Sequence, residues 1–269
     1  MKLLVLGGTV FLGRHVVAAA LGDTVSHYTF MSSVSAYRAY PPGRSYDETA
    51  PLHEGAEGYG PLKARAEEAI EAALSGRVAI VRAGLIVGPH DPTDRFTYWP
   101  RRIARGSDVL APGRPERPVQ FIDARDLAAW CATLAENGTV GAFNAMAYEP
   151  PLTMGALLDA CRTATGSDAR LRWLDDDALL AAGVERWTEM PLWIPEAEPR
   201  VGGMLLADTR RARRAGLTFR PLVDTIRDTL AWDRAEGAQP AERTVRGTPM
   251  TTEREAAILA TMGHRFGRD

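Results

Sequence analysis

A tyrosine and a lysine in the first quarter of the chain have a spacing suited to proton transfer. Tyr59 and Lys63 form a Tyr-x-x-x-Lys sequence at the start of an expected helix, which puts both side chains on one helical face. An ammonium group beside a phenol favours the phenolate and lowers the tyrosine pKa from about 10 toward neutrality. Tyr59 can then exchange a proton with a substrate oxygen. This spacing also occurs by chance, so a solvated helix start is the alternative interpretation.

A glycine-rich turn near the N-terminus suits the binding of a phosphate group. The segment Gly7-Gly8-Thr9-Val10-Phe11-Leu12-Gly13 lies between an apolar run, residues 2–6, and an expected helix, residues 14–21. In this context a pyrophosphate can approach backbone N–H groups at the N-terminus of a helix. Val10 occupies the middle position of the G-x-x-G-x-x-G pattern, where a side chain restricts close approach. A tight turn without a ligand is the alternative.

Together with a run of hydroxyl residues, these motifs resemble a known family. Ser32, Ser33 and Ser35 end the apolar run at residues 28–31, and Tyr37 follows Ser33 by four residues. The chain is similar to the extended short-chain dehydrogenase/reductases, the NAD-dependent epimerase/dehydratase group. Their pattern is a glycine turn, a Ser-Ser-x-x-x-Tyr strand end and Tyr-x-x-x-Lys. Further similarity at residues 82–89, 119–128 and 208–221 extends the resemblance over nearly the whole chain, although Ala83 stands where proline is usual.

The resemblance implies a role for each motif residue. Ser33 would hydrogen-bond the substrate oxygen, Tyr59 would act as acid and base, and Lys63 would hold the nicotinamide ribose and lower the tyrosine pKa. NAD or NADP is the implied cofactor. The residues expected to bind it are Gly7, Gly8, Thr9, Phe11, Leu12, Gly13 and Lys63. The residues expected to contact the substrate are Ser35, His90, Arg95 and Tyr98. For His90 a loop histidine without a catalytic task is the alternative, and core packing explains the neighbouring Trp99 equally well.

The order of apolar runs and helical patterns predicts an α/β fold. Strands are expected at residues 28–31, 78–82, 119–122, 142–144 and 171–174, and the run at 78–82 lacks polar alternation, which favours burial on both faces. Helices are expected at residues 63–74, 94–105, 127–136 with Asp126 as N-cap, 154–165 with Thr153 as N-cap, and 252–262. Residues 187–203 lack periodicity, which favours a mobile flap, a partner-contacting loop or a plain surface excursion.

The expected architecture is a Rossmann-like doubly wound parallel sheet with a small C-terminal substrate-binding subdomain. Residues 1–150 would form the core, and residues 151–269 would form mainly the substrate side, interleaved with the core. Only 26 residues separate Gly7 from Ser33, too few for two further strands with crossovers of roughly 10–12 residues each. We therefore expect an internal deletion near Leu21-Gly22 that removes several strands of the nucleotide-binding half. Either this deletion is genuine, or a stretch of the natural protein is absent from the sequence.

Composition narrows the classes of partner. The 269 residues carry a formal charge of −2 with a pI near 6.2, which argues against nucleic acid and anionic membranes. Cys131 and Cys161 lie in helical patterns and are expected to be small buried thiols, which fits a reducing cytoplasm. The initial apolar run is too short for a signal peptide or a membrane span.

The remaining charged runs have structural interpretations. Residues 175–177 are three aspartates, expected to be a helix N-terminal charge cluster, and no metal site is expected. The arginines at 210–214 are expected to be a solvated helix face.

Two hypotheses of function remain open. The first is an NAD(P)-dependent oxidoreductase or epimerase acting on a carbonyl or alcohol carbon of a nucleotide sugar or a small metabolite, with a homodimer as a further expectation. The second is a cofactor-independent or non-catalytic descendant that transfers protons or serves as a binding scaffold. Val10 and the missing strands favour the second hypothesis, whereas Ser33, Tyr59 and Lys63 together favour the first.

Overall fold

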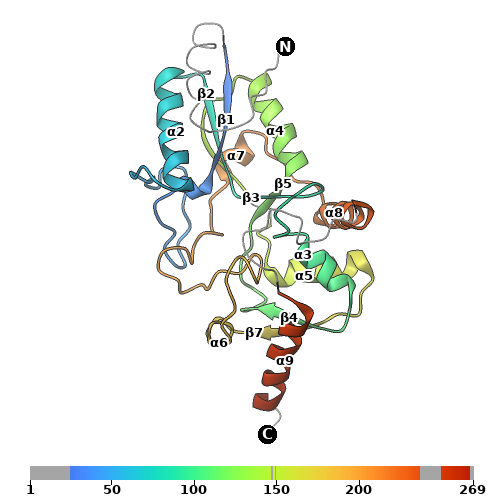
Figure 1. Cartoon of the computed structure of the whole chain (residues 1–269). Helices are drawn as coiled ribbons and strands as arrows, with labels where there is room; N and C mark the ends of the chain where they lie inside the picture. The colour runs from blue at the N-terminus through green and yellow to red at the C-terminus, as the bar shows by residue number, and fades with distance from the viewer. Residues whose placement is uncertain (1–24, 147, 149, 237–249, 267–269) are drawn as a thin grey trace. The chain divides into compact units, whose positions relative to one another are not determined.

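The computed structural model describes residues 25–146, 148, 150–236 and 250–266 (Figure 1). The expected first strand, the glycine turn with Gly7, Gly8, Thr9, Phe11, Leu12 and Gly13, and the expected deletion near Leu21-Gly22 lie outside these residues. The chain forms two compact units that interleave in sequence. The first unit comprises the residues up to Ile86 together with Gln120–Tyr148 and Leu206–Phe219, and the second comprises Val87–Val119, Glu149–Leu205 and the residues from Arg220 onward.

The first unit is built on a parallel sheet. Its described strands are β1 (Tyr28–Ser33), β2 (Val78–Ala83) and β6 (Gly141–Ala145), in the order β1-β2-β6. The register pairs Ser33 with Ala83 and Arg82 with Asn144. Every residue of the central strand β2 is buried, which confirms the prediction of a strand covered on both faces. The parallel pairing confirms the α/β class.

Helices cover both faces of this sheet. The apolar side chains of β2 point alternately to one face and to the other, so each face offers an apolar surface to a helix. On one face, Val78 and Ile80 pack with Ile70 at the end of α2 (Tyr59–Ala73). On the other face, Val81 belongs to the same apolar cluster as Trp130 of α4 (Ala124–Glu136) and Ala212 of α7 (Arg210–Arg214). Figure 1 shows α2 and α4 on opposite sides of β1 and β2.

The start of α4 differs from the prediction. Asp123, not Asp126, is the N-cap: it has extended backbone geometry, and its carboxylate accepts a hydrogen bond from the Arg125 backbone N–H at 2.9 Å. Asp126 lies inside the first turn, where its charge complements the helix dipole. Asp123 also ends β5 (Phe121–Asp123), which forms a two-stranded sheet with β3 (Leu85–Val87), so the chain passes directly from strand to helix.

In its described residues, the second unit contains a small parallel sheet and five helices. The strands are β4 (Asp108–Pro112) and β7 (Arg170–Leu174). The helices are α3 (Tyr98–Ala104), α5 (Met154–Thr165), α6 (Asp176–Ala181), α8 (Leu222–Glu236) and α9 (Thr252–Phe266). Thr153 caps α5 as predicted, since its hydroxyl accepts from the Ala156 N–H at 3.2 Å. The helix expected at residues 94–105 is shorter, and Pro100 lies in its first turn, where no backbone N–H is needed.

The prediction for residues 187–203 was wrong. Met190, Leu192 and Trp193 are fully buried, so this segment belongs to the core of the second unit and is not a surface excursion. Its backbone is irregular, with positive φ angles at Trp187 and Leu192, and no period of 2 or 3.6 therefore appears in its sequence.

Other expectations about local structure are confirmed. Asp175 caps α6 through the Ala178 N–H at 2.7 Å, so the three aspartates do form a helix N-terminal cluster. Both cysteines are free thiols; Cys161 is buried as predicted, whereas Cys131 is only partly buried. Within the described part of the chain, none of the helices combines the length and the apolar character needed to cross a bilayer.

Candidate active site

Ser33 lies at the carboxyl end of β1, where the strand passes into a single 3-10 turn, η1 (Val34–Ala36). Its side chain is buried, and its Oγ accepts a hydrogen bond from the Ser35 backbone N–H at 3.1 Å. The turn is therefore capped by Ser33 itself. Ser35 is half-buried two residues further on.

The start of α2 packs directly against this turn. A Cβ atom on Gly60 would lie 2.2 Å from the Ser35 carbonyl oxygen, so only glycine allows this approach. Gly58, the N-cap of α2, has φ 90, a backbone conformation that favours glycine. The sequence Gly58-Tyr59-Gly60 thus brings the predicted tyrosine to the turn that follows Ser33.

Tyr59 and Lys63 are adjacent, but their environments differ. The Tyr59 side chain is 56% exposed, whereas Lys63 is only 8% exposed. The Lys63 Nζ lies 5.7 Å from the centre of the Tyr59 ring and donates a hydrogen bond to the Met31 carbonyl oxygen at 2.9 Å. Burial lowers the pKa of the Lys63 ammonium, and the negative charge of Glu67 opposes this shift. The arrangement places a buried cation beside an accessible phenol at the carboxyl end of β1.

Behind Lys63 lies a buried ion pair that the sequence analysis did not identify. Arg82 and Glu67 are 5% and 3% exposed, and the Arg82 Nη2 lies 2.7 Å from the Glu67 Oε2. Ser32 Oγ also donates to the Glu67 carboxylate. Two signals in the sequence point to this pair: Glu67 follows Lys63 by four residues on one helix face, and Arg82 interrupts an otherwise apolar strand.

The ion pair continues into a polar network around Tyr37. Arg82 Nη1 donates to the Tyr37 hydroxyl at 2.9 Å, and that hydroxyl donates to the Asn144 Oδ1 at 2.7 Å. Burial, only partly offset by Arg82, raises the pKa of Tyr37 to about 12. Tyr37 therefore remains protonated and structural near neutral pH, and Tyr59 is the accessible phenol at this end of the sheet.

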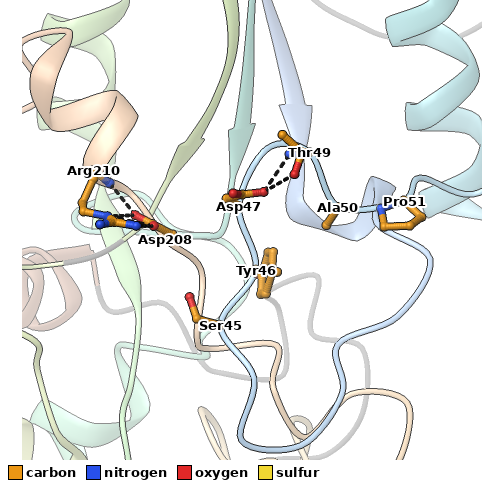
Figure 2. A pocket seen from close by; sticks show the side chains of 8 residues that line it. All are labelled: Ser45, Tyr46, Asp47, Thr49, Ala50, Pro51, Asp208 and Arg210. Atoms are coloured by element: carbon orange, nitrogen blue, oxygen red, sulfur yellow. Dashed lines mark hydrogen bonds and ion pairs between the residues drawn. The ribbon is translucent and has the colours of Figure 1, made fainter.

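The loop after η1 is held to the same network and contributes to a pocket. Glu48 accepts from the Asn144 backbone N–H at 2.8 Å, and its own carbonyl accepts from Arg82 at 3.0 Å. The pocket has a volume of about 500 Å³ (Figure 2). Its lining residues are Ser45, Tyr46, Asp47, Thr49, Ala50, Pro51, Asp208 and Arg210. None of the predicted site residues that the structure describes is among them.

The other predicted substrate residues belong to the second unit. His90 is exposed with φ 70, and its ring centre lies 5.4 Å from that of Trp232. The Arg95 guanidinium lies 5.7 Å from the centre of the Trp187 ring. Tyr98 is buried at the start of α3. Their contact with a substrate stays a prediction.

Trp99, in contrast, is a core residue, because it is fully buried and its Nε1 donates to the Pro191 carbonyl at 3.0 Å.

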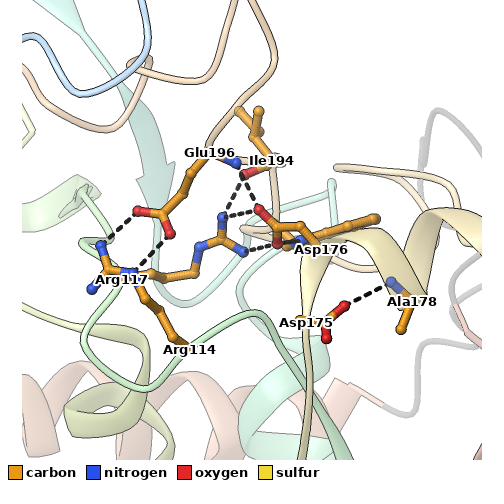
Figure 3. Close-up of polar contacts among 8 residues, drawn as sticks. Arg114, Arg117, Asp175, Asp176, Ala178, Ile194 and Glu196 are labelled. Carbon is orange, nitrogen blue, oxygen red and sulfur yellow. Dashed lines mark hydrogen bonds and ion pairs between the residues drawn. The ribbon is translucent and has the colours of Figure 1, made fainter.

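The second unit also contains a polar cluster that anchors residues 187–203 (Figure 3). Arg117 Nη2 donates to the Ile194 carbonyl at 2.6 Å. Asp176 accepts from Trp193 Nε1 at 2.8 Å and from the Glu196 backbone N–H at 2.7 Å. A buried arginine and a half-buried aspartate thus satisfy backbone groups of this irregular segment. Among all the described residues, no group of three or more His, Cys, Asp or Glu side chains is suited to a metal ion.

A comparison with protein families gives a match to one segment of the chain. The model of the NAD dependent epimerase/dehydratase family matches residues 12–145, a segment that contains Ser33, Tyr59 and Lys63. This segment belongs to that family. A search of curated proteins found no match.

Several solved structures share the fold of this chain. A putative epimerase from Burkholderia cenocepacia has 21% identity and a TM-score of 0.59, with 83% of this chain and 69% of that chain covered. The UDP-glucuronic acid 4-epimerase from Bacillus cereus, in complex with NAD, has 13% identity and a TM-score of 0.60, with 86% and 68% covered. The Thermus thermophilus UDP-glucose 4-epimerase, also in complex with NAD, has 19% identity and a TM-score of 0.55, with 83% and 69% covered. These similarities establish a Rossmann-like α/β fold.

Proposed function

We propose that this protein is an NAD(P)-dependent epimerase or oxidoreductase that acts at a carbonyl or alcohol carbon, with Tyr59 as the acid and base. The observation that carries the proposal is the pairing of an exposed Tyr59 with a buried Lys63 ammonium at the carboxyl end of β1. In open parallel α/β sheets ligands bind beyond the carboxyl ends of the strands. Family membership of residues 12–145 supports the same reaction class.

The residues at this edge fit the nicotinamide end of a dinucleotide. Lys63 provides a buried, charged hydrogen-bond donor beside the phenol, which suits a ribose hydroxyl. The bound dinucleotide would supply hydride acceptance and donation. Gly7, Gly8, Thr9, Phe11, Leu12 and Gly13 are proposed to contact its pyrophosphate through the glycine turn.

The chain's own groups would handle the proton. Tyr59 Oη would take a proton from a substrate hydroxyl or return one to a carbonyl oxygen. The Lys63 ammonium would place its positive charge beside the Tyr59 ring during this transfer. Ser33 Oγ already accepts from the Ser35 backbone N–H, and its hydroxyl hydrogen would donate to the substrate oxygen and orient it.

A nucleotide sugar is the proposed substrate class. The similar structures include proteins described as UDP-glucuronic acid 4-epimerase and UDP-glucose 4-epimerase, each in complex with NAD. A small secondary-metabolite carbonyl is the alternative substrate, because the proton-transfer residues act on any carbonyl or alcohol carbon in reach. Ser35, His90, Arg95 and Tyr98 are the proposed substrate contacts.

Variants of Tyr59 test the proposal. Purified protein is titrated with NADH and NADPH by fluorescence and then incubated with oxidised dinucleotide and a panel of UDP- and dTDP-sugars, with products separated by chromatography. Tyr59→Phe should retain dinucleotide binding and lose roughly 100-fold or more of the turnover. Tyr28→Phe, at the opposite end of β1, is the matched control and should keep full turnover.

Two other outcomes would redirect the proposal. Turnover that survives in Tyr59→Phe would contradict the role of the phenol. Failure to bind either dinucleotide would favour the cofactor-independent or non-catalytic alternative. A homodimer, a cytoplasmic location and the lack of a nucleic-acid partner remain predictions. Light scattering in solution and a salt-dependent nucleic-acid binding assay test the first and the last of these.

A further inference from the structure

Lys63 and Glu67 attach α2 to consecutive residues of β1. The two side chains lie one turn apart on the buried face of the helix. Lys63 Nζ donates to the Met31 carbonyl at 2.9 Å, and the next residue, Ser32, donates its hydroxyl to the Glu67 carboxylate. The lysine and the glutamate therefore share one short stretch of strand, directly before Ser33.

Arg82 fixes the Glu67 carboxylate from the neighbouring strand β2. Its Nε lies 3.1 Å from both Glu67 oxygens, and its Nη2 lies 2.7 Å from Oε2. This two-pronged geometry allows one orientation of the carboxylate. Arg82 is itself held by the Tyr37 hydroxyl and the Glu48 carbonyl. These contacts hold the Glu67 carboxylate in one position on the helix that also carries Lys63.

We propose that Glu67 is a positioning residue for Lys63: held by Arg82 and Ser32, its carboxylate keeps the Lys63 amine charged and in place beside Tyr59. Burial in a poorly polar environment disfavours an ammonium ion, and a carboxylate one helical turn away compensates. Tyr59 and Glu67 on α2 are titratable groups that act on Lys63. From β1 it meets the Phe30 ring and the Met31 carbonyl.

The consequence for the site rests on the proposed function. A neutral or displaced Lys63 would no longer place a positive charge beside Tyr59, and proton transfer by Tyr59 would slow. The positioning itself is independent of any dinucleotide, so it can be measured on the protein alone.

The sequence makes this measurement direct because it contains only two lysines, Lys2 and Lys63. The rate of acetylation by acetic anhydride is recorded against pH, with each labelled peptide quantified by mass spectrometry and Lys2 as internal reference. The pH midpoint for Lys63 is its pKa. The proteins compared are the wild type, Glu67→Gln, Glu67→Asp and the control Glu68→Gln, which changes the exposed neighbouring residue.

Glu67→Gln should lower the pKa of Lys63 by about one unit, which gives roughly tenfold more neutral amine at a given pH. Glu67→Asp, which retains the charge on a shorter side chain, should give an intermediate pKa. Glu68→Gln should leave it unchanged. A folded Glu67→Gln protein with the wild-type Lys63 pKa would overturn the proposal and leave Glu67 with a purely structural role.

Two further arms keep the test decisive. If Glu67→Gln does not fold, Glu67→Asp carries the comparison, and a wild-type Lys63 pKa in that variant overturns the proposal. NADH and NADPH titration of the wild type is run in parallel. A shifted Lys63 pKa without dinucleotide binding would refute the proposed function and leave the positioning role intact.

Discussion

Replacing Arg82 by methionine should strongly destabilise the first unit. Methionine has a similar length but no charge, so the Glu67 carboxylate, only 3% exposed, would lose its ion-pair partner. Removing one member of a buried pair costs about 3–5 kcal/mol, because the other charge remains buried and unpaired. The total free energy of unfolding of a native protein is usually about 5–15 kcal/mol, so the predicted loss is a large share of the total.

Urea unfolding followed by far-UV circular dichroism measures the cost. The matched control is Arg210→Met, which breaks the exposed ion pair with Asp208 in the same unit and should cost about 0–1 kcal/mol. The double variant Arg82→Met/Glu67→Gln should regain much of the loss. It removes both buried charges and keeps an acceptor for the Ser32 hydroxyl.

Two outcomes would refute the role given to the buried Arg82–Glu67 pair. If Arg82→Met costs no more than Arg210→Met, the buried pair contributes nothing to stability. If the double variant is as unstable as Arg82→Met, the cost comes from lost packing or from the bonds to Tyr37 and Glu48, and not from the unpaired carboxylate.

Three further predictions follow from local contacts. Gly60→Ala should lower stability by about 1–3 kcal/mol, because its Cβ would overlap the Ser35 carbonyl, whereas Gly55→Ala, where the nearest atom lies at 3.8 Å, should be neutral in thermal unfolding. Trp193→Ala should cost about 3–5 kcal/mol in urea unfolding, because the ring is fully buried, and a cost under about 1 kcal/mol would contradict its core position. Burial opposes ionisation of Asp176, but hydrogen bonds from a tryptophan ring and a backbone amide lower its pKa below 3.8. The ionised Asp176 thus stabilises the fold above pH 3.8, and this stabilisation is lost as the pH falls through the lowered pKa of Asp176. Asp176→Asn should abolish the loss of stability that this group causes in acid. An acid-unfolding curve that is unchanged in this variant would contradict the assignment.

The parallel sheet of the first unit could be predicted because its strands carry their own signal. Residues 78–82 are almost entirely apolar, and burial of the whole of β2 follows from that composition. Thr153 likewise indicates the start of α5, since a threonine before an apolar helical pattern is a typical N-cap. These features depend on neighbours in sequence, which single-sequence reasoning can use.

Other features depend on residues far apart in the chain. Residues 187–203 are anchored by Arg117 and Asp176, and neither contact produces a periodic pattern of apolar residues in the sequence. The cap of α4 was misplaced because Asp123 and Asp126 are both plausible caps, and only the strand end at β5 selects the first.

The candidate site divides in the same way. Tyr59 and Lys63 share one helix, so their spacing alone predicted that they would be adjacent. The Glu67–Arg82 pair joins a helix to a strand 15 residues away, and only the tertiary fold brings the two charges together. The arginine in an apolar strand was the available signal, because a buried charge requires a partner.

Dinucleotide titration tests the central claim most directly. NADH and NADPH are titrated by fluorescence against the wild type, Tyr59→Phe and Lys63→Met. We expect saturable binding of at least one dinucleotide. This binding should be retained in Tyr59→Phe and weakened about ten- to hundredfold in Lys63→Met, because a hydrogen bond to a charged group is lost. Saturable binding that is unaffected by Lys63→Met, or no binding to the wild type, would contradict it.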